Sequence, residues 1–220
     1  QKKGSDNTLD LYQRILDWHQ AKSKADHVGT ARHQYNLALA YDSKGGFDKA
    51  EKLYHSALND GLKEKSHEAL VLRFRILSNL VCSYGRQGRL EDAQEVLQTL
   101  LPEQMEFLGW DHPDTLVTRH SAALLLQERG SIKDAGGELR RILDAQRSLL
   151  DPDDPALFRT AWSLALNLRL QGRHREAKEL FQETLKLQKQ LLGKDHVDTA
   201  KTKLMLKELL QAVPQSVDES

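Results

Sequence analysis

The residue types in this sequence that most often carry chemistry are nine histidines and one cysteine. Asp-His pairs stand at 26–27, 111–112 and 195–196, far apart along the chain. No HExxH motif and no Cys/His cluster with zinc spacing accompanies them. We expect these histidines to cap helices and pack in loops, and we expect no metal site.

The single cysteine, Cys82, could act as a nucleophile if His120 served as its base. It stands beside Leu80, Val81 and Tyr84, where a small apolar packing residue is the commoner occupant. A Gly-rich phosphate loop is also absent from the sequence. We therefore expect a non-enzymatic chain without a catalytic residue, a cofactor or a small-molecule substrate.

The composition excludes several classes of partner. Thirty-two basic and 32 acidic residues give a net charge of zero, whereas a general nucleic-acid binder needs an excess of Lys and Arg. No apolar run approaches the roughly 18–20 residues that cross a bilayer. One cysteine permits no internal disulfide and favours a reducing compartment. The expected location is cytoplasmic, with neither a nucleic acid nor a membrane as partner.

The elements that position these residues follow from a phrase that recurs four times. It reads NLALAYDSKGGFDKA at 36–50, NLVCSYGRQGRLEDA at 79–93, SAALLLQERGSIKDA at 121–135 and SLALNLRLQGRHREA at 163–177. A fixed period of 42–43 residues is the signature of a stacked repeat protein. Such chains bury the apolar face of each unit against its neighbours and bind partners along a surface.

Apolar residues at steps of three and four predict two antiparallel helices in each repeat. The Gly of the phrase ends the first helix, and the Ala five residues later lies where the two helices cross closely. We expect Leu37, Leu80, Ala122 and Leu164 to be core positions, together with Tyr41, Tyr84, Leu126 and Leu168. The predicted helix pairs are 28–44 with 47–60, 68–87 with 90–107, 113–129 with 132–149, and 155–171 with 174–192.

A second phrase marks the junctions between repeats. It reads LGWDHPDT at 108–115 and LGKDHVDT at 192–199, with weaker copies at 25–30 and 149–157. An Asp before a helix accepts hydrogen bonds from its free N–H groups. We therefore expect the following helix to be capped by Asp26, Asp111, Asp153 and Asp195.

These signals divide the chain into one repeat domain with short polar tails. We expect disordered tails over 1–8 and 212–220, and a repeat domain over 9–211. Within the domain, a helix over 9–25 precedes repeats at 28–66, 67–109, 112–151 and 154–193, and a last helix spans 196–211. The apolar first helix also suggests that the natural protein continues N-terminally.

The third repeat departs from the pattern. Gly136-Gly137 opens its second helix, where each Gly costs about 1 kcal/mol of helix stability, and Glu138 replaces an apolar residue. Two interpretations stay open: a softer hinge, or closer packing of a neighbour against Gly136. Trp110 in the junction likewise marks either an exposed contact or packing over helix ends.

The pattern resembles the tetratricopeptide repeat, because Leu37, Tyr41, Ala50, Tyr54 and Ala57 fall where that family places its helix-packing residues. The longer unit, NLAxxYxxxGxxxxA together with LGxDHPDT, is similar to the repeats of kinesin light chains. The resemblance covers about residues 9–211. It implies an all-α fold of about ten helices, a right-handed superhelical solenoid.

In the family that the chain resembles, the first helices of successive repeats line a concave groove. That set leans basic here, and Arg can grip a carboxylate with two hydrogen bonds while Asn can pair with a peptide backbone. The alternative is that these arginines are solvated or pair with acids on neighbouring helices. The predicted partner-binding residues are Arg32, Asn36, Arg75, Asn79, Arg86, Arg159, Trp162, Arg169 and Lys201.

The resemblance implies a scaffold or adaptor that binds a protein or peptide partner, which we expect to be acidic, in the groove. Kinesin light chains are similar in binding short acidic segments with an aromatic anchor. The alternative function is a C-terminal sensor array of a larger signalling ATPase of the innate-immunity type. Self-association through the ends of the repeat array is a third expectation.

Overall fold

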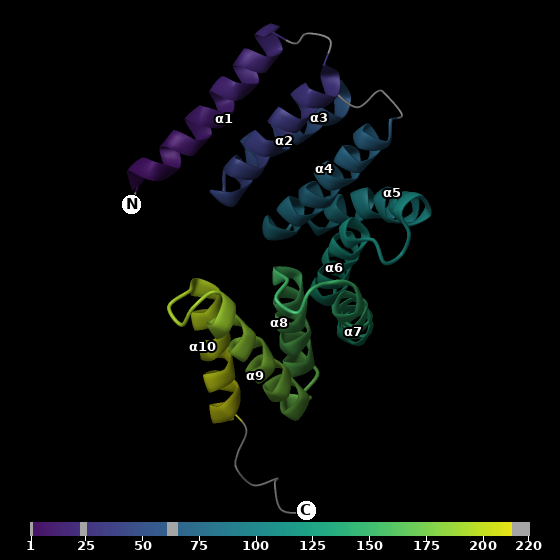
Figure 1. The fold of residues 1–220 in the computed structure, drawn as a ribbon. Coiled ribbons are helices and arrows are strands. Elements are labelled where there is room, and N and C mark those ends of the chain that lie inside the picture. The colour runs from purple at the N-terminus through teal and green to yellow at the C-terminus, as the bar shows by residue number, and fades with distance from the viewer. Residues whose placement is uncertain (1, 23–25, 61–65, 213–220) are drawn as a thin grey trace, which may run out of the picture. The chain divides into compact units, whose positions relative to one another are not determined.

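A computed structural model describes residues 2–22, 26–60 and 66–212, which form ten α-helices and no strand (Figure 1). The helices are α1 (Lys2–Lys22), α2 (His27–Ser43), α3 (Phe47–Asp60), α4 (His67–Arg86), α5 (Leu90–Leu108), α6 (Pro113–Glu128), α7 (Ile132–Leu149), α8 (Pro155–Leu170), α9 (His174–Leu191) and α10 (Val197–Ala212). The all-α repeat fold is confirmed, and each helix from α2 to α10 lies within one residue of its predicted bounds.

The chain divides into two compact units, Gln1–Gly109 and Trp110–Ser220. We call α2, α4, α6, α8 and α10 the A helices, and α1, α3, α5, α7 and α9 the B helices. Each A helix from α2 to α8 packs against the B helix that follows it, and α10 packs against α9. The expectation of a tail over 1–8 is wrong for residues 2–8, which belong to α1. Gly4 alone is too weak a breaker to stop a helix. Of the predicted C-terminal tail, only Ala212 lies within the described residues.

The Gly and Ala of the repeated phrase act as predicted. Each repeated Gly has a positive φ, between 72° and 87°, which a residue without a Cβ adopts at little cost and which ends the A helix. The four Ala residues are at most 1% exposed, at the crossing of A and B helices. The residues in question are Gly45, Gly88, Gly130, Gly172, Ala50, Ala93, Ala135 and Ala177.

Most of the predicted core positions are buried, with Leu126 the clear exception. Leu126 is 38% exposed, because α6 buries Ala123 and Leu125 instead. Ala122 and Tyr41 are half-buried. Trp162 packs against the buried cluster of the second unit, which includes Leu164 and Phe181.

The helix caps lie one residue later than predicted at three of the four junctions. Asp26 accepts a hydrogen bond from the Gly29 N–H (2.7 Å), as expected. The cap of α8 is Asp154, and Nδ1 of His112 and His196 accepts from the helix N–H two residues on. The prediction that Asp111, Asp153 and Asp195 cap the following helices is wrong. Those helices, α6, α8 and α10, begin at Pro113, Pro155 and Val197, directly after the actual caps. The interpretation of the histidines as capping residues is confirmed for His112 and His196.

Buried hydrogen bonds tie neighbouring A helices together, at the same repeat positions in each unit. In the first unit, Ser83 Oγ donates to Asp42 Oδ1 (2.9 Å) and Asn79 Nδ2 donates to Tyr35 Oη (3.0 Å). In the second unit, Asn167 Nδ2 donates to Gln127 Oε1 (2.8 Å), and His120 Nε2 lies 3.0 Å from Ser163 Oγ. A buried polar group that loses its partner costs about 1–3 kcal/mol, so these bonds fix the register of the A helices.

Two departures of the third repeat, Glu138 and Gly136, are each matched by a neighbouring side chain. Arg119, buried on α6, forms an ion pair with Glu138, and its Cζ lies 3.4 Å from the ring centroid of Trp110. Trp110 therefore packs on Arg119 and also keeps exposed surface, at 36% exposure, so both interpretations of it stay open. Glu138 stands where the other repeats have an apolar residue because the buried Arg119 needs a counter-charge.

Gly136 leaves room for the buried Asn167. A Cβ on Gly136 would lie 2.3 Å from Asn167 Oδ1 and 2.5 Å from Gln171 Nε2, whereas a Cβ on Gly137 would meet nothing within 4 Å. Asn167 is fully buried and also donates to the Ile132 carbonyl (3.0 Å), so it cannot move away freely. The closer-packing interpretation of Gly136 therefore accounts for this glycine.

Gly136→Ala and Gly137→Ala are expected to change stability in opposite directions. Both substitutions replace a helical Gly by Ala, and this change alone adds about 1 kcal/mol of helix stability. Only Gly136→Ala displaces Asn167 from its hydrogen bonds, for a net loss of about 1–2 kcal/mol. Urea unfolding followed by circular dichroism measures both, and a Gly136→Ala variant as stable as Gly137→Ala would contradict the packing role.

Candidate functional site

The predicted groove residues fall into two sets, one in each compact unit. Arg32, Asn36, Arg75, Asn79 and Arg86 lie on α2 and α4 of the first unit. Arg159, Trp162, Arg169 and Lys201 lie on α8 and α10 of the second unit.

In the first unit, two predicted arginines are engaged by acids of neighbouring helices. Arg86 forms an ion pair with Asp42, whose carboxylate is buried, and Arg32 forms one with Glu68. The alternative of pairing between helices thus holds for both arginines. Asp42 is an interior partner, which also accepts a hydrogen bond from Ser83.

The two asparagines of the first unit also differ from each other. Asn79 donates to Tyr35 Oη and to the Arg75 carbonyl (2.9 Å), so both N–H groups of its amide are used inside the protein. Asn36 is half-buried on α2. Arg75 is exposed on α4. Asn79 therefore has no amide N–H left to donate to a peptide backbone.

In the second unit, Arg169 and Lys201 have acidic neighbours. Arg169 Nη1 lies 3.6 Å from Glu208 Oε2, and Lys201 Nζ lies 3.8 Å from Asp198 Oδ1. Both pairs are at least one-third exposed, so each is worth little energetically. Arg159 is exposed and has no carboxylate within ion-pair distance in the described part of the chain.

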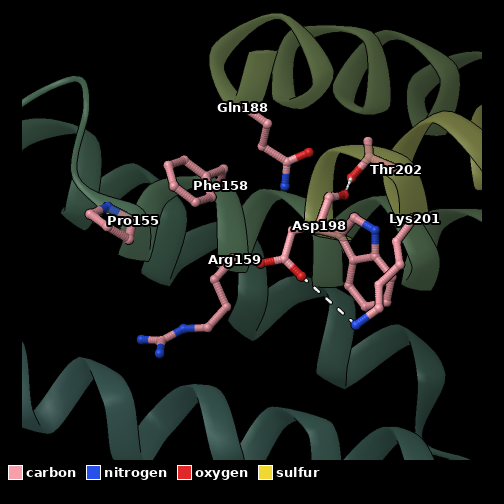
Figure 2. Close-up of a pocket in the computed structure, with 8 residues that line it drawn as sticks. Pro155, Phe158, Arg159, Gln188, Asp198, Lys201 and Thr202 are labelled. Carbon is pink, nitrogen blue, oxygen red and sulfur yellow. Dashed lines mark hydrogen bonds and ion pairs between the residues drawn. The ribbon is translucent and has the colours of Figure 1, made fainter. Parts of the chain in front are cut away.

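A pocket between α8, α9 and α10 brings three predicted residues together (Figure 2). Its volume is about 350 Å³, at the lower end of the range for ligand sites. Arg159, Trp162 and Lys201 line it. In Figure 2, the Arg159 side chain extends away from the Asp198–Lys201 pair. The lining residues that sequence reasoning missed are Pro155, Phe158, Gln188, Asp198 and Thr202.

The missed residues left only faint signals in the sequence. Asp198 suits the positive end of a helix dipole. Because that role explains the residue, the sequence does not indicate that Asp198 also lines the pocket. Gln188 belongs to a B helix, whereas the groove prediction counted A helices alone. Its recurrence with Gln104 and Gln146 at 42-residue steps is the one pattern that could have marked it.

His120, one repeat before Trp162, is a buried and neutral histidine. Burial lowers its pKa to about 4, and the positive charge of Arg159 acts in the same direction. Its Nε2 is paired with Ser163 Oγ, and Cys82 is half-buried on α4 of the other unit. Among the described residues, no group of three or more His, Cys, Asp or Glu side chains is placed to hold a metal ion. No described helix is both long and apolar enough for a membrane span.

A family model described as tetratricopeptide repeat matches residues 1–60, 123–190 and 157–213, which is more than half of the sequence. The chain belongs to the tetratricopeptide repeat family. No protein of curated function matches this tetratricopeptide repeat chain in sequence.

Solved structures share the tetratricopeptide repeat fold at low identity. BtubC (BKLC) from P. vanneervenii is 17% identical, with a TM-score of 0.71 over 94% of this chain and 81% of that one. A kinesin light chain-like protein from Podospora anserina with nearly identical TPR-like repeats is 19% identical, with a TM-score of 0.58 over 84% and 87%. The apo quorum sensor NprR from B. thuringiensis is 16% identical, with a TM-score of 0.57 over 92% and 59%. At these identities the likeness concerns the fold.

The buried His120 predicts an acid-sensitive second unit. Its pKa lies near 4 in the fold, against 6.5 when unfolded, so its neutral form stabilises the fold fully above pH 6.5. That stability is lost as the pH falls from 6.5 toward 4, by about 2–3 kcal/mol at pH 4.5. His120→Gln cannot titrate, and urea unfolding at pH 7 and pH 4.5 should show a correspondingly smaller loss than in the wild type.

The exposed His174 on α9 provides the control. His174→Gln should lose as much stability on acidification as the wild type does. Equal acid sensitivity of His120→Gln and the wild type would contradict the role of His120.

Proposed function

We propose that this chain is a non-enzymatic interaction scaffold that binds a partner peptide with carboxylate side chains on the faces of its A helices. Tetratricopeptide repeat proteins generally mediate protein–protein interactions. The single observation that carries the proposal is the α8–α10 pocket, where Arg159 has no acidic partner among the described residues and stands beside apolar walls.

The chemistry of the pocket suits one anchoring side chain with an acidic neighbour. Phe158, Trp162 and Pro155 offer apolar surface, and buried anchors of this kind contribute most of the affinity in peptide recognition. Arg159 is not committed to an internal carboxylate, so a ligand carboxylate gains a bidentate partner without displacing one. Lys201 is held by Asp198 and adds to the positive character of the rim.

The first unit supports this proposal less strongly than the second. Arg86 already neutralises a buried carboxylate, and Arg32 is paired with Glu68. A partner that recruited Arg86 would have to separate it from a buried carboxylate, whereas the exposed Arg32–Glu68 pair is weak and costs little to break. We therefore place the main contact in the second unit, and we propose a cytoplasmic setting because Cys82 is a lone thiol.

The test uses a phage-displayed library of random dodecapeptides, selected against the wild-type chain. Retained peptides should carry Asp or Glu, and Arg159→Glu should weaken them at least tenfold, because a charge-assisted contact of about 1.4 kcal/mol is lost. Fluorescence polarisation with the synthesised peptides measures the dissociation constants.

Arg175→Glu makes the same charge change at an exposed arginine of α9 outside the pocket. Its affinities should stay within about twofold of the wild type, since exposed charges away from a contact contribute little. Failure to retain any peptide, or equal effects of the two substitutions, would overturn the proposed function.

A further inference from the structure

Gln188 of α9 places a side-chain amide at the wall of the α8–α10 pocket. The residue is 3% exposed, and its Oε1 has no hydrogen-bond partner in the described part of the chain. Figure 2 shows the amide pointing between Phe158 and Thr202. Buried polar groups in proteins are nearly always paired, so an unpaired acceptor in the wall of a pocket can take a donor from a ligand.

The same position of the repeat provides an internal comparison. Gln146 stands 42 residues before Gln188, is 2% exposed, and also has an Oε1 without a partner. It does not line this pocket. A buried glutamine is thus a recurring feature of the B helix, and the Gln188 copy is the one that faces this pocket.

The groups around Gln188 discriminate between ligand side chains. Thr202 Oγ1 donates its hydrogen to the Asp198 carbonyl (3.0 Å), so the hydroxyl cannot donate to a ligand carboxylate. The Asp198 carboxylate lies on the same pocket wall and repels an acidic tip. An apolar tip would leave the Gln188 Oε1 unpaired, which lowers affinity relative to a tip that donates.

We infer that the pocket recognises a side-chain carboxamide, that of Gln or Asn, in the partner peptide. A carboxamide donates to the Gln188 Oε1 and accepts from the Gln188 amide at once, which no aliphatic side chain and no ionised carboxylate does. The flat amide also packs against the apolar walls of Phe158 and Pro155. This inference deepens the proposed function and rests on it.

Arg159 adds a second element to the recognised sequence. It lines the same pocket and has no carboxylate partner within the described ranges of the chain, so it can hold an acidic residue next to the carboxamide. The recognised segment is then a Gln or Asn flanked by Asp or Glu. The two contacts are separable, because Arg159 lies on α8 and Gln188 on α9.

The experiment uses an array of acetylated nonapeptides in which position 4 is Asp and position 5 is each amino acid in turn. The remaining positions are equimolar mixtures. Wild-type protein should bind the Gln and Asn peptides at least fivefold better than the Leu, Met and Glu peptides. Gln188→Met, which has a similar shape and no amide, should lose that preference and favour Leu and Met.

Gln146→Met is the matched control and should keep the wild-type preference. Removal of an unpartnered amide breaks no hydrogen bond, so both Met variants should melt within a few degrees of the wild type by circular dichroism. The wild-type array decides the matter without either variant if one of them fails to fold.

Binding that depends on Arg159 but shows no preference for Gln or Asn would overturn the carboxamide inference and leave the proposed function standing. An equal change of preference in Gln146→Met would also overturn it. No binding of any array peptide, with no effect of Arg159→Glu, would instead remove the proposed function and this inference together.

Discussion

Buried hydrogen bonds between neighbouring A helices fix the register on which the remainder of each unit depends. Apolar packing alone would let two helices slide, since one aliphatic contact resembles the next. A fully buried Asn167 that must meet Gln127, or a Ser83 that must meet Asp42, permits one register. In the second unit these bonds hold α8, which forms one wall of the pocket, against α6.

The same constraint determines where charge is available. Two predicted groove arginines of the first unit form ion pairs with carboxylates of the neighbouring A helix, so their charges are already used within the protein. Arg159 differs because no acid stands within its reach among the described residues. The basic lean of the predicted groove therefore includes charges that pair within the first unit, whereas Arg159 stands beside a pocket without such a pair among the described residues.

The sequence was sufficient for the fold because Gly and Ala at fixed positions have one physical reason each. It could not predict which arginines pair, since the Arg86–Asp42 pair joins residues 44 positions apart through side-chain conformations that no periodicity encodes. The caps were misplaced by one residue because Asp is the stronger capping residue, yet His112 and His196 occupy the capping position. Gln188 was missed because the groove prediction considered only the A helices.

The position of Asp42 corresponds to Gly85, Gln127 and Arg169 in the later repeats. Gly85 has no side chain with which to accept a hydrogen bond, so this interhelical bond cannot recur at every step of the period. The bond forms between the first and second repeats, with Ser83 as donor, and again between the third and fourth, with Asn167 as donor. The smallest segment that gene duplication could copy together with one complete interhelical bond is thus a pair of repeats, about 84 residues. The packing phrase, by contrast, repeats every 42 residues.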